Sequence, residues 1–231
     1  MRKKPALLAL VVIGSVLAGC APILKANFEA DTVGSPPSLS PAGSPEGDRL
    51  TLQGSTGSIV VVQSGILGSK AVKLDRTSAP PATVFDGIPT GAPHRGGSYD
   101  VCFRAYSLED KAPLNISIQS STRKRAFLVV FKNGACEVIS GNGKDSLPGP
   151  YSQQMAHTFC FRVRMSDRTF SVSVDDEWRI TEQPFLDAEF SEVQFIRFEY
   201  FPAVLEAFPG VYVLDDLIIS ERGWPSIWFL K

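Results

Sequence analysis

The stretch that decides the fold is HTFCFRVRMSDRTFSVSVDD, residues 157–176. Apolar and polar residues alternate in it over two runs, 157–165 and 169–175. The apolar positions are Phe159, Phe161, Val163, Met165, Phe170, Val172 and Val174. Successive side chains of a β-strand point to opposite faces, so this period of two predicts two half-buried strands.

Similar short runs, separated by turn residues, occur on both sides of this stretch. They are 58–63, 71–75, 99–106, 114–120, 126–132, 135–140, 193–201 and 211–219. Asn133-Gly134 lies between two of them and is a strong hairpin signal. Segments 31–48 and 78–97, rich in Pro, Gly and Ser, predict loops. Because no long segment has a helical period, the sequence predicts an all-β protein, an antiparallel β-sandwich.

The N-terminus has the features of an export signal. Three basic residues at 2–4 precede an apolar run over 6–16, and Leu17-Ala18-Gly19-Cys20 follows. This tetrapeptide resembles the lipobox of bacterial lipoproteins. The resemblance implies cleavage before Cys20 and acyl chains on its sulfur and new amino group, which would anchor the chain to a membrane. An ordinary signal peptide or a short anchor helix is the alternative, although the apolar run is shorter than the roughly 20 residues that span a bilayer.

Removal of residues 1–19 leaves 212 residues with 20 basic and 24 acidic side chains, a net charge of −4. This charge gives no support to nucleic-acid binding. We expect a lipidated tether over 20–26, one sandwich domain over 27–221 and an apolar tail over 222–231. The tail either packs on the sandwich or contacts a partner or the membrane. Ala21 follows the lipidated cysteine instead of an aspartate, which favours the outer membrane of a two-membrane bacterium.

Cys102, Cys136 and Cys160 remain once Cys20 is lipidated, and an exported chain can keep a disulfide. The segments around Cys102 and Cys160 share a pattern, with the cysteine and an arginine on one strand face and apolar residues on the other. This similarity favours a bridge between Cys102 and Cys160. The third cysteine is then free or paired elsewhere.

The order of several short motifs resembles the concanavalin A-like jelly rolls, which include laminin-G-like domains and bacterial carbohydrate-binding modules. The motifs are Asn27-Phe28-Glu29, the segment 67–74, the paired strands that end at Asp175-Asp176, and the segment 211–219. The resemblance covers residues 26–221 and implies a fold more than an activity. One departure is Asp176, which stands where the family usually has Gly.

In related sugar-binding jelly rolls, the first and last strands share a structural calcium ion. The matching positions are Glu29, Asp31, Asp215 and Asp216, and Ca²⁺ takes six to eight oxygen ligands. The alternative is that these carboxylates face solvent or cap turns.

Asp187, Glu189 and Glu192 are similar to the Glu-x-Asp-x-x-Glu motif of laminarinase-type glycoside hydrolases on this fold. A retaining mechanism needs its two carboxylates about 5–5.5 Å apart. The motif is altered here, with Asp in place of the first Glu and Glu in place of the Asp. We therefore favour a solvated acidic turn and expect no enzymatic activity.

An exposed aromatic side chain on a sheet can stack on a sugar ring. Trp178, Tyr151 and Tyr200 are the candidates, with Trp178 preferred because it follows the acidic turn at 175–177. The sequence thus predicts a lipid-anchored envelope protein with a noncatalytic glycan-binding sandwich. The alternatives are a structural or assembly lipoprotein that binds another envelope protein and, least favoured, a glycoside hydrolase.

Overall fold

The structure is a computed structural model that describes residues 22–41, 45, 49–54, 58–77, 83–147, 151, 154–200 and 209–222. These residues form strands, turns and loops, and none of them lies in a helix that is long and apolar enough to span a membrane. The predicted signal, Cys20 and tail residues 223–231 lie outside the described residues.

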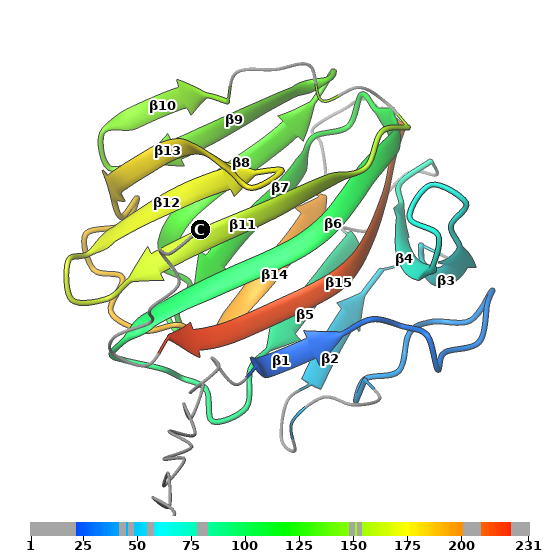
Figure 1. Ribbon diagram of the computed structural model, residues 1–231, viewed down its shortest axis with the longest axis horizontal. Helices are drawn as coiled ribbons and strands as arrows, with labels where there is room; N and C mark the ends of the chain where they lie inside the picture. The colour runs from blue at the N-terminus through cyan, green and yellow to red at the C-terminus, as the bar shows by residue number, and fades with distance from the viewer. Residues whose placement is uncertain are drawn as a thin grey trace, which may run out of the picture.

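Two antiparallel sheets stack face to face (Figure 1). The first sheet has the order β13-β12-β11-β6-β15-β4-β3, with β1 paired to β15. Its strands are β1 (Pro22–Ala26), β3 (Ile59–Gln63), β4 (Lys70–Asp75), β6 (Ser98–Asp110), β11 (His157–Arg164), β12 (Thr169–Val174), β13 (Glu177–Pro184) and β15 (Gly210–Arg222).

The second sheet has the order β10-β9-β8-β7-β14-β5-β2. Its strands are β2 (Arg49–Gln53), β5 (Thr83–Ile88), β7 (Leu114–Gln119), β8 (Arg125–Lys132), β9 (Ala135–Ser140), β10 (Gly143–Ser146) and β14 (Phe195–Tyr200). The predicted all-β antiparallel sandwich is therefore confirmed.

The core lies between the two sheets and is rich in phenylalanine. Phe161 of β11 stacks on Phe127 of β8 with ring centroids 4.8 Å apart, and Phe103 of β6 meets Phe198 of β14 at 5.1 Å. The apolar residues of the alternating runs point inward and are buried, except for the partly buried Met165, while Arg162 and Arg164 point outward. The alternation at 157–175 thus placed one face of each strand in the core.

Two hairpins use residues with positive φ. Asn133 and Gly134, with φ of 53° and 71°, connect β8 to β9 as predicted. Asp175 and Asp176, with φ of 51° and 64°, connect β12 to β13. Both centres have the positive φ values of a type I′ turn, so Asp176 adopts a backbone conformation that favours glycine.

All ten predicted strands are present, with their ends shifted by a few residues, and the described residues form five further strands that were not predicted. The tether predicted over 20–26 is wrong for residues 22–26. These residues form β1, pair with β15 and bury Leu24 and Ala26 completely. β5 lies inside the segment 78–97 that composition assigned to a loop, and β2 begins directly after the loop predicted over 31–48. β10 and β13 are outer strands of their sheets.

β15 organises the first sheet, because it pairs with β6, β4 and β1 (Figure 1). Its register with β6 shifts between Asp215 and Ile218, and Asp216 has a φ of 52°. This irregularity changes the alternation along the strand. Asp215 is consequently buried, and Asp216 is exposed enough to approach Arg104.

Candidate functional site

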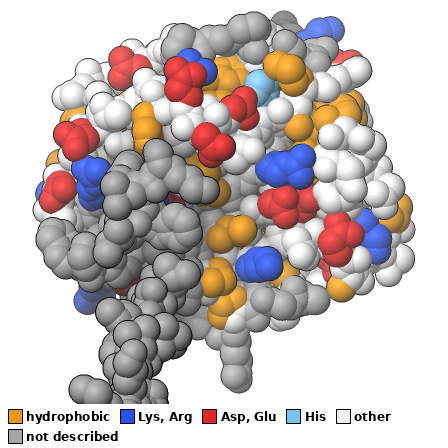
Figure 2. All heavy atoms as spheres, viewed as in Figure 1, with side chains coloured by type: hydrophobic (Ala, Val, Ile, Leu, Met, Phe, Trp, Pro, Cys, Tyr) orange, Lys and Arg blue, Asp and Glu red, His pale blue; other side chains and the backbone are white. Residues whose placement is uncertain are grey.

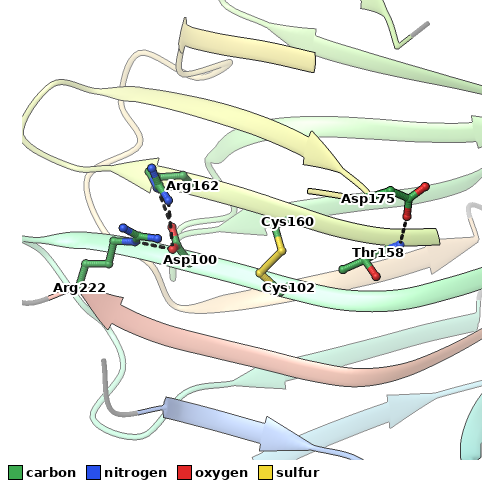
Figure 3. Close-up of a disulfide and its surroundings, with 7 residues drawn as sticks. All are labelled: Asp100, Cys102, Thr158, Cys160, Arg162, Asp175 and Arg222. Carbon is green, nitrogen blue, oxygen red and sulfur yellow. Dashed lines mark hydrogen bonds and ion pairs between the residues drawn. A yellow bond between two sulfur atoms is a disulfide. The ribbon is translucent and has the colours of Figure 1, made fainter. Parts of the chain in front are cut away.

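The outward face of the first sheet carries a row of paired positions across four strands. Trp178 of β13 is opposite Ser173 of β12, which is opposite Cys160 of β11, and Cys160 is opposite Cys102 of β6. Cys102 and Cys160 form a disulfide, with a Cα–Cα distance of 4.2 Å (Figure 3). The predicted pairing is confirmed. Cys136 is buried and unbridged, and burial raises the pKa of its thiol well above the usual value, which disfavours the reactive thiolate.

An ion-pair cluster lies beside the disulfide on the same face (Figure 3). Arg162 donates from Nε to Asp100 Oδ1 at 2.9 Å and from Nη2 to Oδ2 at 3.4 Å. Arg222 of β15 also donates to Asp100. The side chains of Arg162 and Asp100 are only 12% and 18% exposed, so this pair is less screened by solvent than a surface ion pair. Asp100 therefore holds Arg162 in one position over the sheet.

Trp178 is an exposed aromatic residue on this face, with 39% of its surface accessible. The guanidinium carbon of Arg162 lies 4.7 Å from the centroid of the Trp178 ring, which is a cation–π contact. Ser171 and Ser173 of β12 are buried on the same outward face. We call this group of Trp178, Arg162, Asp100, Ser171 and Ser173 the Trp178 platform.

The Trp178 platform combines an apolar ring with hydrogen-bonding groups. An indole face can pack on the C–H face of a pyranose, and a guanidinium or carboxylate can bind its hydroxyl groups. Arg162 is already ordered by Asp100, so it loses little conformational freedom when a ligand binds. The described part of this side of the molecule shows acidic and basic side chains next to one another (Figure 2).

The other two predicted ligand-binding residues are not on the surface, and this part of the prediction is wrong. Tyr200 is fully buried in the core, with its ring 6.2 Å from that of Tyr212. Tyr151 is 9% exposed and packs against Phe131 and Phe159. Burial raises the pKa of both hydroxyls. No local pattern around these tyrosines separates a core ring from an exposed one.

A small cavity lies between the two sheets beside Tyr151. Its volume is about 30 Å³, and its lining is mostly apolar, with Phe103, Phe159 and Tyr212 among the lining residues. His157 also lines it; its Nδ1 atom is hydrogen-bonded to Asp175 at 2.7 Å, whereas its Nε2 atom is buried without a partner. A volume of this size holds about one or two waters and excludes a sugar ring.

The four carboxylates of the predicted calcium site have separate partners. Glu29 accepts the main-chain N–H of Lys70 at 2.9 Å, and Asp31 accepts that of Ser38 at 3.3 Å. Asp216 lies 3.5 Å from Arg104. Within the described part of the chain, no group of three or more His, Cys, Asp or Glu side chains is arranged to hold a metal ion.

Asp215 is the buried member of this set, at 1% exposure. Its Oδ2 accepts a hydrogen bond from the Ser69 hydroxyl, and its Oδ1 has no partner. Burial raises the pKa of this carboxyl to about 6, and the charges of Asp216 and Glu29 act in the same direction. The hydrogen bonds from Ser69 and the main chain of Asp216 oppose the rise without cancelling it.

A cation that does approach these residues is the side chain of Lys70. Its ammonium donates to the main-chain carbonyl oxygens of Glu29, at 2.9 Å, and Asp31, at 2.8 Å. Carbonyl oxygens of this kind are typical Ca²⁺ ligands, and here they are already satisfied. The residues therefore do not fit the calcium site that the family resemblance implied.

The acidic residues at 187–192 are each held by a different partner. Asp187 accepts the main-chain N–H of Arg125 at 2.6 Å, and Glu189 pairs with Lys124 at 2.6 Å. Glu192 is buried, unlike the solvated turn that we predicted, and pairs with Arg95 at 3.0 Å. A hydrogen bond from the Ser121 hydroxyl is the main reason that the pKa of Glu192 is lowered.

Comparisons with known proteins find solved structures with a similar fold. A scan against protein-family models and a search of curated proteins both find no match. A sialidase structure has a TM-score of 0.60 and 13% identity, covering 75% of this chain and 17% of that one. The binding domain of botulinum neurotoxin serotype D has a TM-score of 0.58 and 13% identity, covering 87% of this chain and 48% of that one. A botulinum neurotoxin type C structure has a TM-score of 0.56 and 10% identity, covering 87% of this chain and 48% of that one.

At these identities the likeness shows the fold alone. The chain spans less than half the length of each of these three structures. It is thus a β-sandwich of the class that recurs as one domain within larger proteins.

Proposed function

We propose that this chain is a noncatalytic glycan-binding protein, anchored to a bacterial envelope by lipid on Cys20. The anchor is supported by the lipobox-like end of the N-terminal segment and by the absence of acidic residues from 1–19. The outer membrane is the preferred location because Ala21 follows the cysteine. The net charge of −4 after cleavage argues against a nucleic-acid partner.

The observation that carries the binding function is the Trp178 platform. Its ring is exposed, Arg162 contacts it at 4.7 Å, and Asp100 fixes Arg162. In the proposed complex a sugar ring packs on the accessible part of the indole. Hydroxyl groups of the sugar bind the guanidinium of Arg162 and the carboxylate of Asp100.

The structural neighbours support a glycan as the ligand. One is a sialidase, and another is botulinum neurotoxin type C, whose cell entry depends on interaction with two ganglioside molecules. A shared fold does not transfer a ligand, so this support is secondary to the platform itself.

The absence of catalysis is part of the proposal. Glycoside hydrolysis needs two carboxylates that act on one glycosidic bond. Asp187, Glu189 and Glu192 are instead engaged by three different basic or main-chain partners. None of these three described residues lines the cavity between the sheets. We therefore assign them a structural role in the connection between β13 and β14.

The test is binding of the full chain, purified in detergent, to a panel of cell-wall and cell-surface glycans. We expect at least one glycan to bind, and Trp178→Ala to weaken that binding by about 10-fold or more through loss of the stacking surface. Leu39→Ala is the matched control, because Leu39 is also exposed, at 54%, and lies outside the platform. Binding that survives Trp178→Ala would contradict the assigned site, and a panel without any ligand would contradict glycan binding.

A second candidate function is that of a structural or assembly lipoprotein. A separate apolar cluster of Leu67, Ala71, Tyr106 and Val213 supports it, because it lies apart from the main core. Ile66, next to Leu67 in the chain, is 39% exposed and gives this buried cluster an accessible apolar neighbour. Co-purification of a specific envelope protein with the wild-type chain, lost in Ile66→Asp, would favour this function over glycan binding.

A further inference from the structure

Lys70 makes an unusual set of contacts at the start of β4. Its ammonium donates to the carbonyl oxygens of Glu29 and Asp31, at 2.9 and 2.8 Å. Its main-chain N–H donates to the carboxylate of Glu29 at 2.9 Å. One residue thus fastens the segment after β1 to β4 through three hydrogen bonds.

The surroundings of this ammonium are rich in oxygen and in negative charge. Besides the two carbonyl groups, two carboxylates contact this part of the chain: Glu29 accepts the main-chain N–H of Lys70 at 2.9 Å, and Asp215 accepts the hydroxyl of the neighbouring Ser69. Asp215 also has one buried oxygen without a partner. Arg104 is paired with Asp216, and no carboxylate lies within ion-pair distance of the Lys70 ammonium among the described residues. Lys70 is therefore bound chiefly by carbonyl oxygens, as a metal cation is.

Carbonyl oxygens and nearby carboxylates are the ligands that Ca²⁺ takes in proteins. An ammonium has a single charge and three N–H donors, so it can satisfy the same carbonyl groups. Both cations would need the same two oxygen atoms, and they cannot occupy that position together. The arrangement explains why the acidic residues near the first and last strands, within the described part of the chain, do not form a metal-binding cluster.

We infer that the Lys70 ammonium takes the place of a structural calcium ion and makes this sandwich independent of calcium. The positive charge that a bound metal ion would supply comes instead from the side chain of Lys70. The segment that it holds follows β1 directly, and β1 begins two residues after Cys20. The strand nearest to the proposed lipid anchor is thus fixed without a metal ion. This inference does not depend on glycan binding.

The test compares thermal unfolding of the full chain and of Lys70→Ser, each in excess EDTA and in millimolar CaCl₂. Serine removes the ammonium and leaves space beside the two carbonyl groups. We expect wild type to unfold at the same temperature in both buffers. We expect the Tm of Lys70→Ser in EDTA to be lower by roughly 3–8 °C, because two carbonyl groups lose a charged donor, and to recover in part with CaCl₂.

Lys73→Ser is the matched control. Lys73 is on the same strand and pairs with the Asp75 carboxylate at 2.7 Å, without contact to the loop carbonyl groups. CaCl₂ should restore stability to Lys70→Ser and not to Lys73→Ser. Three results would overturn the inference: stabilisation of wild type by CaCl₂, an unchanged Tm for Lys70→Ser in EDTA, or a lowered Tm that CaCl₂ fails to raise.

Discussion

Asp215 is expected to make stability depend on pH in a sense opposite to most carboxylates. Its side chain is buried, and its pKa rises from the ordinary value of 3.8 to about 6. At about 1.4 kcal/mol for each tenfold change in acidity, this rise corresponds to about 3 kcal/mol. The folded protein bears this cost whenever Asp215 is ionised.

The sign follows from proton binding. Between pH 3.8 and about 6, the folded state keeps a proton on Asp215 that the unfolded state has lost. The unfolding free energy due to this group therefore falls as the pH rises through that window. Above about pH 6 the full cost of about 3 kcal/mol is present. Below pH 3.8 the carboxyl is protonated in both states and the cost is absent.

Urea unfolding of wild type and of Asp215→Asn over pH 4–7.5 measures this effect. Asparagine keeps the shape and cannot ionise. Its amide group adds an offset, because a buried N–H without a partner costs about 1–3 kcal/mol, but that offset does not change with pH. We expect the stability of the variant relative to wild type to increase by about 2.5 kcal/mol from pH 4 to pH 7.5, because about 0.5 kcal/mol of the cost is already present at pH 4.

Asp75→Asn is the control of opposite sign. Burial alone would raise the pKa of Asp75, but hydrogen bonds from Lys73 and Thr77 outweigh it and lower the pKa. Asp75→Asn should thus be less stable than wild type at neutral pH, with the difference shrinking in acid. Parallel pH profiles for wild type and Asp215→Asn would refute the reasoning, and so would an Asp215 carboxyl that titrates by NMR near 3.8.

Three further predictions concern the fold. Replacing both Cys102 and Cys160 by serine should lower the unfolding free energy by about 4 kcal/mol in urea, because the bridge spans 58 residues; an unchanged midpoint would contradict this. Leu24→Ala should lower the unfolding free energy by about 2–5 kcal/mol in the same assay, since β1 is part of the core. A decrease below about 0.5 kcal/mol would indicate that residues 22–26 are a tether and not part of the core. Asp176→Gly should raise the unfolding free energy by up to about 1 kcal/mol, because the φ of Asp176 is 64°; a lower unfolding free energy would contradict the turn geometry.

Much of the fold was predictable from local patterns. The alternation around Phe159 and Phe161 fixed which face of β11 enters the core, and Asn133-Gly134 fixed a hairpin. The shared pattern around Cys102 and Cys160 favoured their pairing, which the structure confirms, because strands with matching alternation present their cysteines on equivalent faces. These signals depend on residues close together in the chain.

The strands that were not predicted depend on distant partners. β1 carries only Leu24 and Ala26 to the core and is ordered by its pairing with β15, almost 200 residues later. β5 is flanked by loop-forming residues and is held between β14 and β2. Short segments like these have little preference of their own, and the sheet supplies their hydrogen bonds.

The sequence by itself indicated the class of the fold, the disulfide and Trp178 as the aromatic residue to test. Each of these predictions depended on residue spacing or on residues adjacent in the chain. Only the tertiary structure decided that Tyr151 and Tyr200 are core residues and that Asp215 is buried beside Ser69. It also placed the Lys70 ammonium on carbonyl groups some 40 residues earlier in the chain. The burial of a side chain and the charges around it depend on residues that are close in space but distant in sequence, and residue spacing along the chain does not specify these neighbours.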